Sequence, residues 1–331
     1  MPESRLLTDE ELKHRLQSPP SIDSVPPTEE SGGDASLLSY FSPTTKAVDS
    51  YLYYLNNDAA FTTGLKPIDL CFPGGLDRGD MFLITGKSHS GKSTVAYNML
   101  VHNLRRSDDF TAVLFSPDEP RELAVQKLFC IAMGRNALDV EDAIRRGDES
   151  AQRELYNAAS GLLDRVLIND QSLNFPQMLE AVQEAAKYWG KPPSAVVIDY
   201  LELLHGTSDA NGVAAKAQAA KRFAKDADVP LIVLHQTGRG ASERGKPAGL
   251  HGGRFGGENE SVAVLECYRP KDQTNLSPRE QIQLENVLRL NLAKNKRPPY
   301  RLIDAEMILD PDCGRVREVN VDDLEEREWV M

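Results

Sequence analysis

The sequence predicts an α/β fold: a mostly parallel, twisted sheet with helices on both faces. From about residue 60 onward, short runs rich in Val, Ile and Leu alternate with segments of helical periodicity. A glycine-containing segment, 86–93, lies directly between the first apolar run and the first helical segment. With 331 residues, the chain is long enough for one large domain with a substantial core.

Each expected element follows from its local pattern. The expected strands are 81–85, 111–116, 165–169, 194–199, 230–235, 261–267 and 287–294. The expected helices are 92–105, 121–133, 149–163, 175–188 and 213–226.

The regions outside this core have a different composition. Residues 1–36 are rich in Pro, Ser, Gly and acids, which is typical of a disordered tail. Residues 37–57 contain apolar side chains at helical spacing, so we expect a linker helix that docks on its own domain or on a neighbouring subunit. The main domain is expected at 58–315, and 316–331 form an acidic C-terminal tail.

Charge restricts how the chain could contact nucleic acid. The net charge of −12 argues against a protein that coats nucleic acid over its whole surface. Basic residues gather in one glycine-rich stretch after the strand at 230–235: Arg239, Arg244, Lys246 and Arg254. We expect these four residues to form a local DNA-binding loop.

Targeting and redox signals are absent from the sequence. There is no run long enough to cross a bilayer and no signal peptide, so we expect no membrane contact and a cytoplasmic location. The four cysteines are far apart, with no CxxC pair, and are expected to remain reduced thiols.

The segment 86–93 reads GKSHSGKS and matches the phosphate-binding pattern GxxxxGK[ST] between a strand and a helix. Glycines in the pattern allow backbone N–H groups to surround phosphate oxygens, and the following helix adds its dipole. The pattern predicts ATP and Mg²⁺ as cofactors, with Lys92 on the phosphates and Ser93 on the metal. The expected nucleotide contacts are Gly86, Ser90, Gly91, Lys92, Ser93 and Thr94.

Polar residues at the ends of three other strands complete the predicted site. Asp199 ends the strand 194–199 and is expected to hold Mg²⁺. Asp118 and Glu119 follow the strand 111–116, and either could position the attacking water while the other caps the next helix. Gln236 follows the strand 230–235 and could sense the γ-phosphate.

These segments resemble the motor domain of the DnaB-type replicative DNA helicases, which are RecA-like P-loop NTPases. The resemblance runs from about Thr44 to Asp310 and includes FSPDEPRELAVQKLF, VVIDYLELL, PLIVLHQTGRG and NLAKNKRPP in the order of the family. It implies that Asp118 aligns with the catalytic glutamate of the family. It also implies that Lys294, with Lys296 or Arg297, presents a cation to the ATP of a neighbouring subunit.

The resemblance implies a ring, expected to be hexameric, that moves along single-stranded DNA and unwinds duplex in replication. Implied partners are other copies of the chain and a helicase loader or primase. About 45 residues precede the core, too few for the helical primase-contacting domain of the family, which is compatible with a virus-encoded helicase. Two alternatives remain: a recombinase or strand-annealing ATPase, and an ATP-gated loader subunit with weak hydrolysis.

Overall fold

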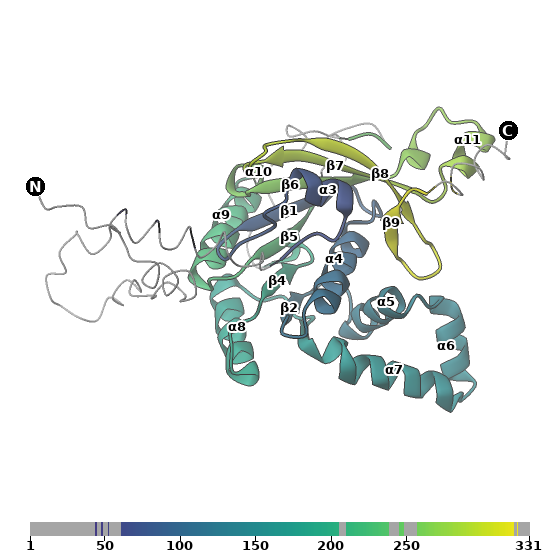
Figure 1. Cartoon of the computed structure of the whole chain (residues 1–331), viewed down its shortest axis with the longest axis horizontal. Helices are drawn as coiled ribbons and strands as arrows, with labels where there is room; N and C mark the ends of the chain where they lie inside the picture. The colour runs from purple at the N-terminus through teal and green to yellow at the C-terminus, as the bar shows by residue number, and fades with distance from the viewer. Residues whose placement is uncertain are drawn as a thin grey trace, which may run out of the picture. The chain divides into compact units, whose positions relative to one another are not determined.

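The computed structural model describes residues 61–204, 210–237, 245–247 and 257–320, together with Thr44, Val48, Leu52 and Asp323. The expected tail and most of the expected linker helix lie outside the described residues, as do Arg239, Arg244 and Arg254. The unit that spans residues 60–331 is organised around a nine-stranded sheet (Figure 1).

The sheet is parallel in its first part and antiparallel in its last part. Its strands are β1 (Met81–Gly86), β2 (Ala112–Phe115), β3 (Val166–Asn169), β4 (Ala195–Ile198), β5 (Leu231–Gln236), β6 (Ala263–Tyr268), β7 (Val287–Asn295), β8 (Ile303–Leu309) and β9 (Val316–Glu318). They lie in the order β3-β2-β4-β5-β1-β6-β7-β8-β9. Strands β1 to β6 pair in parallel, and β7, β8 and β9 continue the sheet in antiparallel pairs. The first strand therefore lies inside the sheet, between β5 and β6.

The described helices connect the strands and cover the sheet. They are α3 (Lys66–Cys71), α4 (Lys92–Arg106), α5 (Arg121–Met133), α6 (Ala137–Arg145), α7 (Glu149–Gly161), α8 (Phe175–Trp189), α9 (Ala210–Asp226), α10 (Gly257–Glu260) and α11 (Pro278–Gln283). Short 3-10 turns are η2 (Leu163–Arg165), η3 (Leu201–Leu203) and η4 (Pro270–Asp272). Side-chain hydrogen bonds cap the N-termini of several helices. At α8, for example, Asn174 and Gln177 form a capping box.

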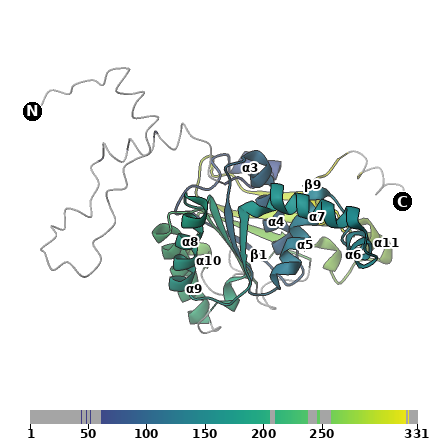
Figure 2. The ribbon, with the colours of Figure 1, turned by 90° about the horizontal axis from the view of Figure 1, so that it is seen from below.

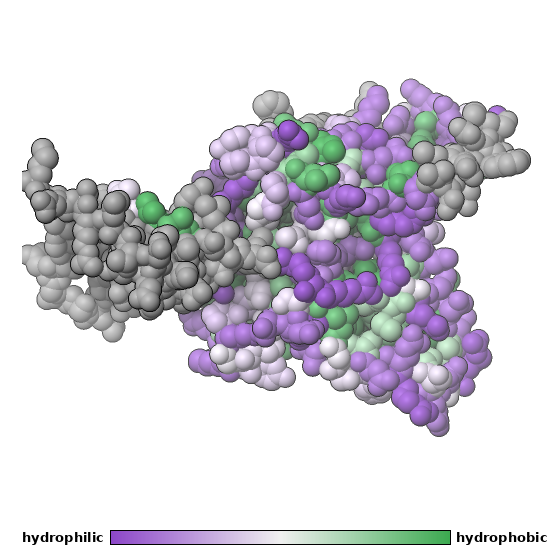
Figure 3. All heavy atoms as spheres, in the orientation of Figure 1, coloured by the Kyte–Doolittle hydropathy of each residue, from purple (hydrophilic) through white to green (hydrophobic). Residues whose placement is uncertain are grey.

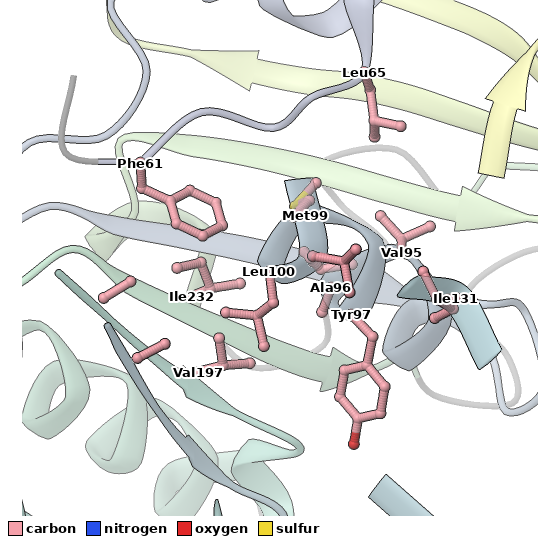
Figure 4. Packing of buried hydrophobic residues seen from close by; sticks show 14 of the residues in the cluster. Phe61, Leu65, Val95, Ala96, Tyr97, Met99, Leu100, Ile131, Val197 and Ile232 are labelled. Carbon is pink, nitrogen blue, oxygen red and sulfur yellow. The ribbon is translucent and has the colours of Figure 1, made fainter. Parts of the chain in front are cut away.

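Alternate residues of the central strands face two separate hydrophobic clusters. On β1, Phe82 and Ile84 pack in the cluster with α4 and α5, whereas Met81 and Leu83 pack in the cluster with α8 and α9. Figures 1 and 2 show these two pairs of helices on opposite faces of the sheet. Figure 4 shows Leu100 of α4 beside sheet residues of the first cluster. Burial on both faces explains why the central strands read as continuous apolar runs.

The structure extends the sheet beyond the last strand that we expected. In β8, charged residues interrupt the apolar pattern because Glu306 and Asp304 form ion pairs with Arg289 of β7. Residues 316–318, which the sequence analysis assigned to the acidic tail, instead form β9 and pair with β8. This assignment is corrected: three residues are too few for a periodic signal, and only the neighbouring edge of β8 makes them a strand.

The described surface is mainly polar. Hydrophilic residues dominate the face in Figure 3, and the exposed large apolar side chains include Leu70, Tyr156 and Tyr188, which come from three different helices. Within the described part of the chain, no helix is both long and apolar enough to cross a membrane. All four cysteines are buried and free of disulfides.

Candidate functional site: a phosphate loop at the carboxyl edge of the parallel strands

The segment 86–93 leaves β1 and enters α4 as the sequence pattern predicts. Gly86 has φ +154° and Gly91 has φ +96°, conformations that side chains with a Cβ adopt rarely. A Cβ at Gly86 would lie 2.4 Å from both the carbonyl oxygen of Cys267 and Oγ of Ser90. Glycine is therefore required at Gly86 by backbone conformation and by close packing.

Ser90 supports the interpretation of this loop as a ligand cradle. Its Oγ atom is buried and has no hydrogen-bond partner among the described residues. A buried hydroxyl without a partner is costly, so a bound acceptor such as a phosphate oxygen would satisfy it. The loop is thus shaped to receive an anion.

Lys92 lies deeper than its place in an exposed loop would suggest. The residue is only 8% exposed, and Nζ donates a hydrogen bond to the carbonyl oxygen of Lys87 at 2.8 Å. Burial lowers the pKa of Lys92, while nearby acids, among them Asp199 and Glu202, act in the opposite direction. The ammonium is held inside the loop, where a phosphate would lie.

Asp199 and Ser93 lie together beside this loop. Asp199 follows β4, and its backbone N–H donates to the carbonyl oxygen of Phe115 of β2 at 2.8 Å. Burial raises the pKa of Asp199 to about 6, while a hydrogen bond with Ser93 acts in the opposite direction. A carboxylate and a hydroxyl are oxygen ligands of the kind that Mg²⁺ prefers, so this pair fits the predicted metal site.

The two acids after β2 differ in their contacts. The carboxylate of Glu119 lies 2.5 Å from Nζ of Lys127 on α5. Asp118 is exposed and has no ion pair with a described residue. Both carboxylates raise the pKa of Asp199, after the larger effect of burial, and Glu119 acts more strongly than Asp118. Both acids therefore lie within electrostatic reach of the expected metal site.

Gln236 lies directly beside the start of the loop. It is the register partner of Gly86 in the β1–β5 pair, and the next residue, Thr237, donates its backbone N–H to the carbonyl oxygen of Gly86 at 3.1 Å. A carboxylate oxygen of Glu202 accepts the backbone N–H of Gln236 at 2.7 Å. Glu202 was not among the residues singled out from the sequence.

The three cations expected at the end of β7 lie level with the start of β1, whereas the phosphate loop follows the end of β1. Arg297 pairs with Asp80, which precedes β1, at 2.5 Å, and with Asp77 at 3.1 Å. Lys296 is exposed, and its Nζ donates to the carbonyl oxygen of Asn259 at 3.2 Å. The phosphate loop follows β1 at its other end, so these cations do not reach the P-loop of their own chain.

Lys294 is more enclosed than Lys296. Its Nζ donates to the carbonyl oxygen of Glu258 in α10. Burial, together with the nearby charge of Lys296, lowers the pKa of Lys294 to about 8. Lys294 therefore contributes contacts that hold the end of β7 against α10.

One cavity is lined by residues of the phosphate loop, and another by the start of the helix that follows it. The larger, about 710 Å³, is lined by the outer residues of the loop, including Lys87 and His89, and by Gln236, Lys246 and Arg269. Lys246, expected to bind DNA, thus lies at the same cleft as the phosphate loop.

The smaller cavity, about 250 Å³, adjoins the first turns of α4. Thr94, Gln126 and Cys130 line it together with residues 311–314. Sequence reasoning missed this last segment as part of a site: its Pro and Gly signal a turn but not what the turn lies against.

A phosphate loop that follows an inner parallel strand, with an acid after β4 and a polar residue after β5, defines a P-loop α/β protein. A family model described as the DnaB-like helicase C terminal domain matches residues 60–300. The chain therefore belongs to the DnaB-like helicase C-terminal domain family, which confirms the resemblance and the fold class inferred from the sequence.

Relatives agree with this assignment. The replicative DNA helicase DnaB of Synechocystis is 27% identical over 177 residues, covering 52% of this chain and 20% of that protein. The DnaB of Mycoplasma pneumoniae is 25% identical over 284 residues, covering 78% of this chain and 57% of that protein. The chain thus matches little more than half the length of these curated relatives at most.

The fold is shared with two solved structures. A solved ATPase domain matches with a TM-score of 0.69 at 19% identity, over 84% of this chain and 99% of that one. A DnaB-like replicative helicase, described together with its interactions with primase, matches with a TM-score of 0.67 at 19% identity, over 85% of this chain and 67% of that one.

Proposed function

We propose that this chain is the ATP-hydrolysing motor of a replicative DNA helicase, which assembles as a ring, most simply of six copies, and moves along single-stranded DNA. One observation carries the proposal: in a DnaB-like domain, Lys92, Ser93, Asp199 and Gln236 all lie at the carboxyl edge of β1, β4 and β5. Ligands of open α/β sheets bind at this edge.

The nucleotide would be bound mainly by the phosphate loop. Lys92 and the loop N–H groups would hold the β- and γ-phosphates, and the hydroxyl of Ser90 would gain the partner it lacks within the described residues. Ser93 and Asp199 would hold Mg²⁺, which when bound neutralises charge on the phosphate oxygens. The cavity beside Thr94 is contiguous with the start of α4 and would accept the nucleoside.

We assign the water-positioning role to Asp118. Glu119 already pairs with Lys127, which holds its carboxylate against α5. Asp118 has no such pair among the described residues and is exposed at the end of β2. In this assignment Asp118 accepts a proton from the attacking water, and Glu119 anchors the start of α5.

We assign the cation that acts between subunits to Lys296. The cations after β7 lie at the edge opposite to their own phosphate loop, so they can act only on ATP bound by another copy. Because Arg297 is engaged by Asp77 and Asp80, we infer that Arg297 holds this turn and that Lys296 is presented to the neighbour. Lys294 would support Lys296 from the same strand end.

DNA contact is assigned to the basic stretch after β5. Lys246 lies at the cleft beside the phosphate loop, and Arg239, Arg244 and Arg254 belong to the same stretch of sequence. This stretch of sequence follows Gln236, the residue that faces Gly86, and we assign to it the coupling of phosphate release to DNA movement. Local cations can track a single strand although the whole chain is acidic.

The direct test is ATP-dependent unwinding of a forked DNA by the full chain, with Lys92→Ala as the inactive control. We expect unwinding and DNA-stimulated hydrolysis that both disappear in the control. DNA-stimulated hydrolysis and strand pairing without unwinding would instead indicate a recombinase. ATP-dependent assembly with little hydrolysis would indicate a loader subunit.

A further inference from the structure

Glu202 fills a gap in the sheet next to the phosphate loop. Strand β4 pairs with β5 only as far as the Ile198–Val233 pair, whereas β5 continues to Gln236. The backbone N–H of Gln236 therefore extends beyond the end of β4. Oε1 of Glu202 accepts this N–H at 2.7 Å and so replaces the missing strand partner.

The side chain of Glu202 is 20% exposed, and several elements contact either its carboxylate or the turn that carries it. Oε1 lies 2.8 Å from Nδ1 of His235, whose side chain is only 3% exposed. Oε2 is buried and has no hydrogen-bond partner among the described residues. The turn η3 that carries Glu202 is fixed by Lys216 of α9, which donates to the carbonyl oxygen of Glu202 at 2.8 Å. Ser172 donates to the carbonyl oxygen of Leu203 at 2.7 Å.

Taken by itself, this arrangement lowers the free energy of unfolding. A buried carboxylate oxygen without a partner loses its hydration and gains nothing in return. The carboxylate nevertheless connects the turn after Asp199, which carries it, to the end of β5, and these are the two segments that the proposed function places at the metal and at the γ-phosphate. Its geometry fits a link between them.

We propose that Glu202 is a positioning residue of the ATPase reaction: its carboxylate fixes the backbone of Gln236 beside Gly86, so that the side chain of Gln236 is held at the phosphates. The inference rests on the proposed function, because it takes Gln236 as the residue that contacts the γ-phosphate. It adds that the turn after Asp199 and the strand end carrying Gln236 move as one unit.

The test compares Glu202→Met, which keeps the volume but removes the acceptor, with Glu202→Gln, which keeps an acceptor oxygen. In steady-state ATPase assays of the full chain, Glu202→Met should lower kcat about tenfold or more, with KM for ATP within about threefold of wild type. Glu202→Gln should keep kcat within about threefold. Ser172→Ala removes one hydrogen bond from the same turn without touching the carboxylate, and it should keep wild-type kinetics.

A double-mutant cycle then separates positioning from a general structural role. If Glu202 acts through Gln236, the variant with both Glu202→Met and Gln236→Ala should be no slower than Gln236→Ala alone. Multiplicative losses in the double variant would overturn the inference. So would a folded Glu202→Gln protein whose kcat falls about tenfold or more below wild type, and this outcome can be measured even if Glu202→Met does not fold.

The outcomes also distinguish the inference from the function on which it rests. A wild-type chain that does not hydrolyse ATP would overturn the proposed function. Turnover that is lost in Lys92→Ala and in Gln236→Ala but kept in Glu202→Met would leave the proposed function intact and overturn the role of Glu202 alone.

Discussion

Lys296→Ala should remove most turnover while leaving the fold unchanged. An arginine supplied to a neighbouring phosphoryl group contributes about 10³-fold or more to kcat, so we expect a loss of at least about 100-fold for this lysine. The side chain is exposed, and its hydrogen bond to Asn259 measures 3.2 Å. The free energy of unfolding should therefore change by less than about 0.5 kcal/mol.

Arg297→Ala is the matched control because it changes the adjacent cation. Its guanidinium lies 2.5 Å from Asp80 and 3.1 Å from Asp77, and these carboxylate side chains are 14% and 23% exposed. Loss of this partly screened pair should cost about 1–2 kcal/mol, a few degrees in melting temperature. Turnover should fall much less than in Lys296→Ala.

Mixing two inactive proteins tests whether Lys296 acts between subunits. The Lys92→Ala protein keeps Lys296, and the Lys296→Ala protein keeps its phosphate loop. In randomly mixed head-to-tail rings at equal amounts, about a quarter of the interfaces would combine an intact loop with an intact Lys296. We expect ATPase activity up to about that fraction of wild type if the sites act independently.

Either of two results would refute this reasoning. One is a mixture that is no more active than its separate components at any ratio, provided that the proteins exchange subunits. The other is a reversed pattern, in which Arg297→Ala abolishes turnover at unchanged stability and Lys296→Ala is nearly wild type. That pattern would transfer the role to Arg297 and require its ion pair with Asp80 to open in the assembly.

Three further predictions concern the phosphate site itself. Asp118→Asn should lower kcat more than Glu119→Gln, whose main effect should be on stability, and steady-state kinetics with thermal melts would expose the reverse order. Because burial raises the pKa of Asp199 to about 6, Mg²⁺-dependent nucleotide binding should weaken as pH falls through 6, since protons then compete with the metal. Nucleotide titrations at several pH values that show no such trend in binding would contradict the assignment of Asp199 to the metal. The same raised pKa means that, without metal, the Asp199 carboxyl stabilises the fold at low pH and loses that contribution as pH rises through 6. Gly86→Ala should abolish nucleotide binding, because a Cβ would lie 2.4 Å from Oγ of Ser90 and from the carbonyl oxygen of Cys267; calorimetry with wild-type affinity would disprove the close packing.

The sequence by itself determined the parallel core and the phosphate loop. The central strands are buried on both faces, so each is a continuous apolar run with a clear beginning and end. The loop at 86–93 is recognisable because its chemistry requires fixed residue types at fixed spacing along one segment. Family membership follows from several such segments in the same order.

The tertiary structure decided what depends on residues that are distant in sequence. The strand β9 exists only because β8 offers an edge with which it can pair. The different roles proposed for Lys296 and Arg297 depend on the ion pairs of Arg297 with Asp77 and Asp80, which lie more than 200 positions earlier in the sequence. The carboxylate of Glu202 matters because β4 ends before β5 does, a difference in length that shows only when the strands are paired. A sequence pattern records spacing along one segment, whereas a partner across the sheet is fixed by the fold.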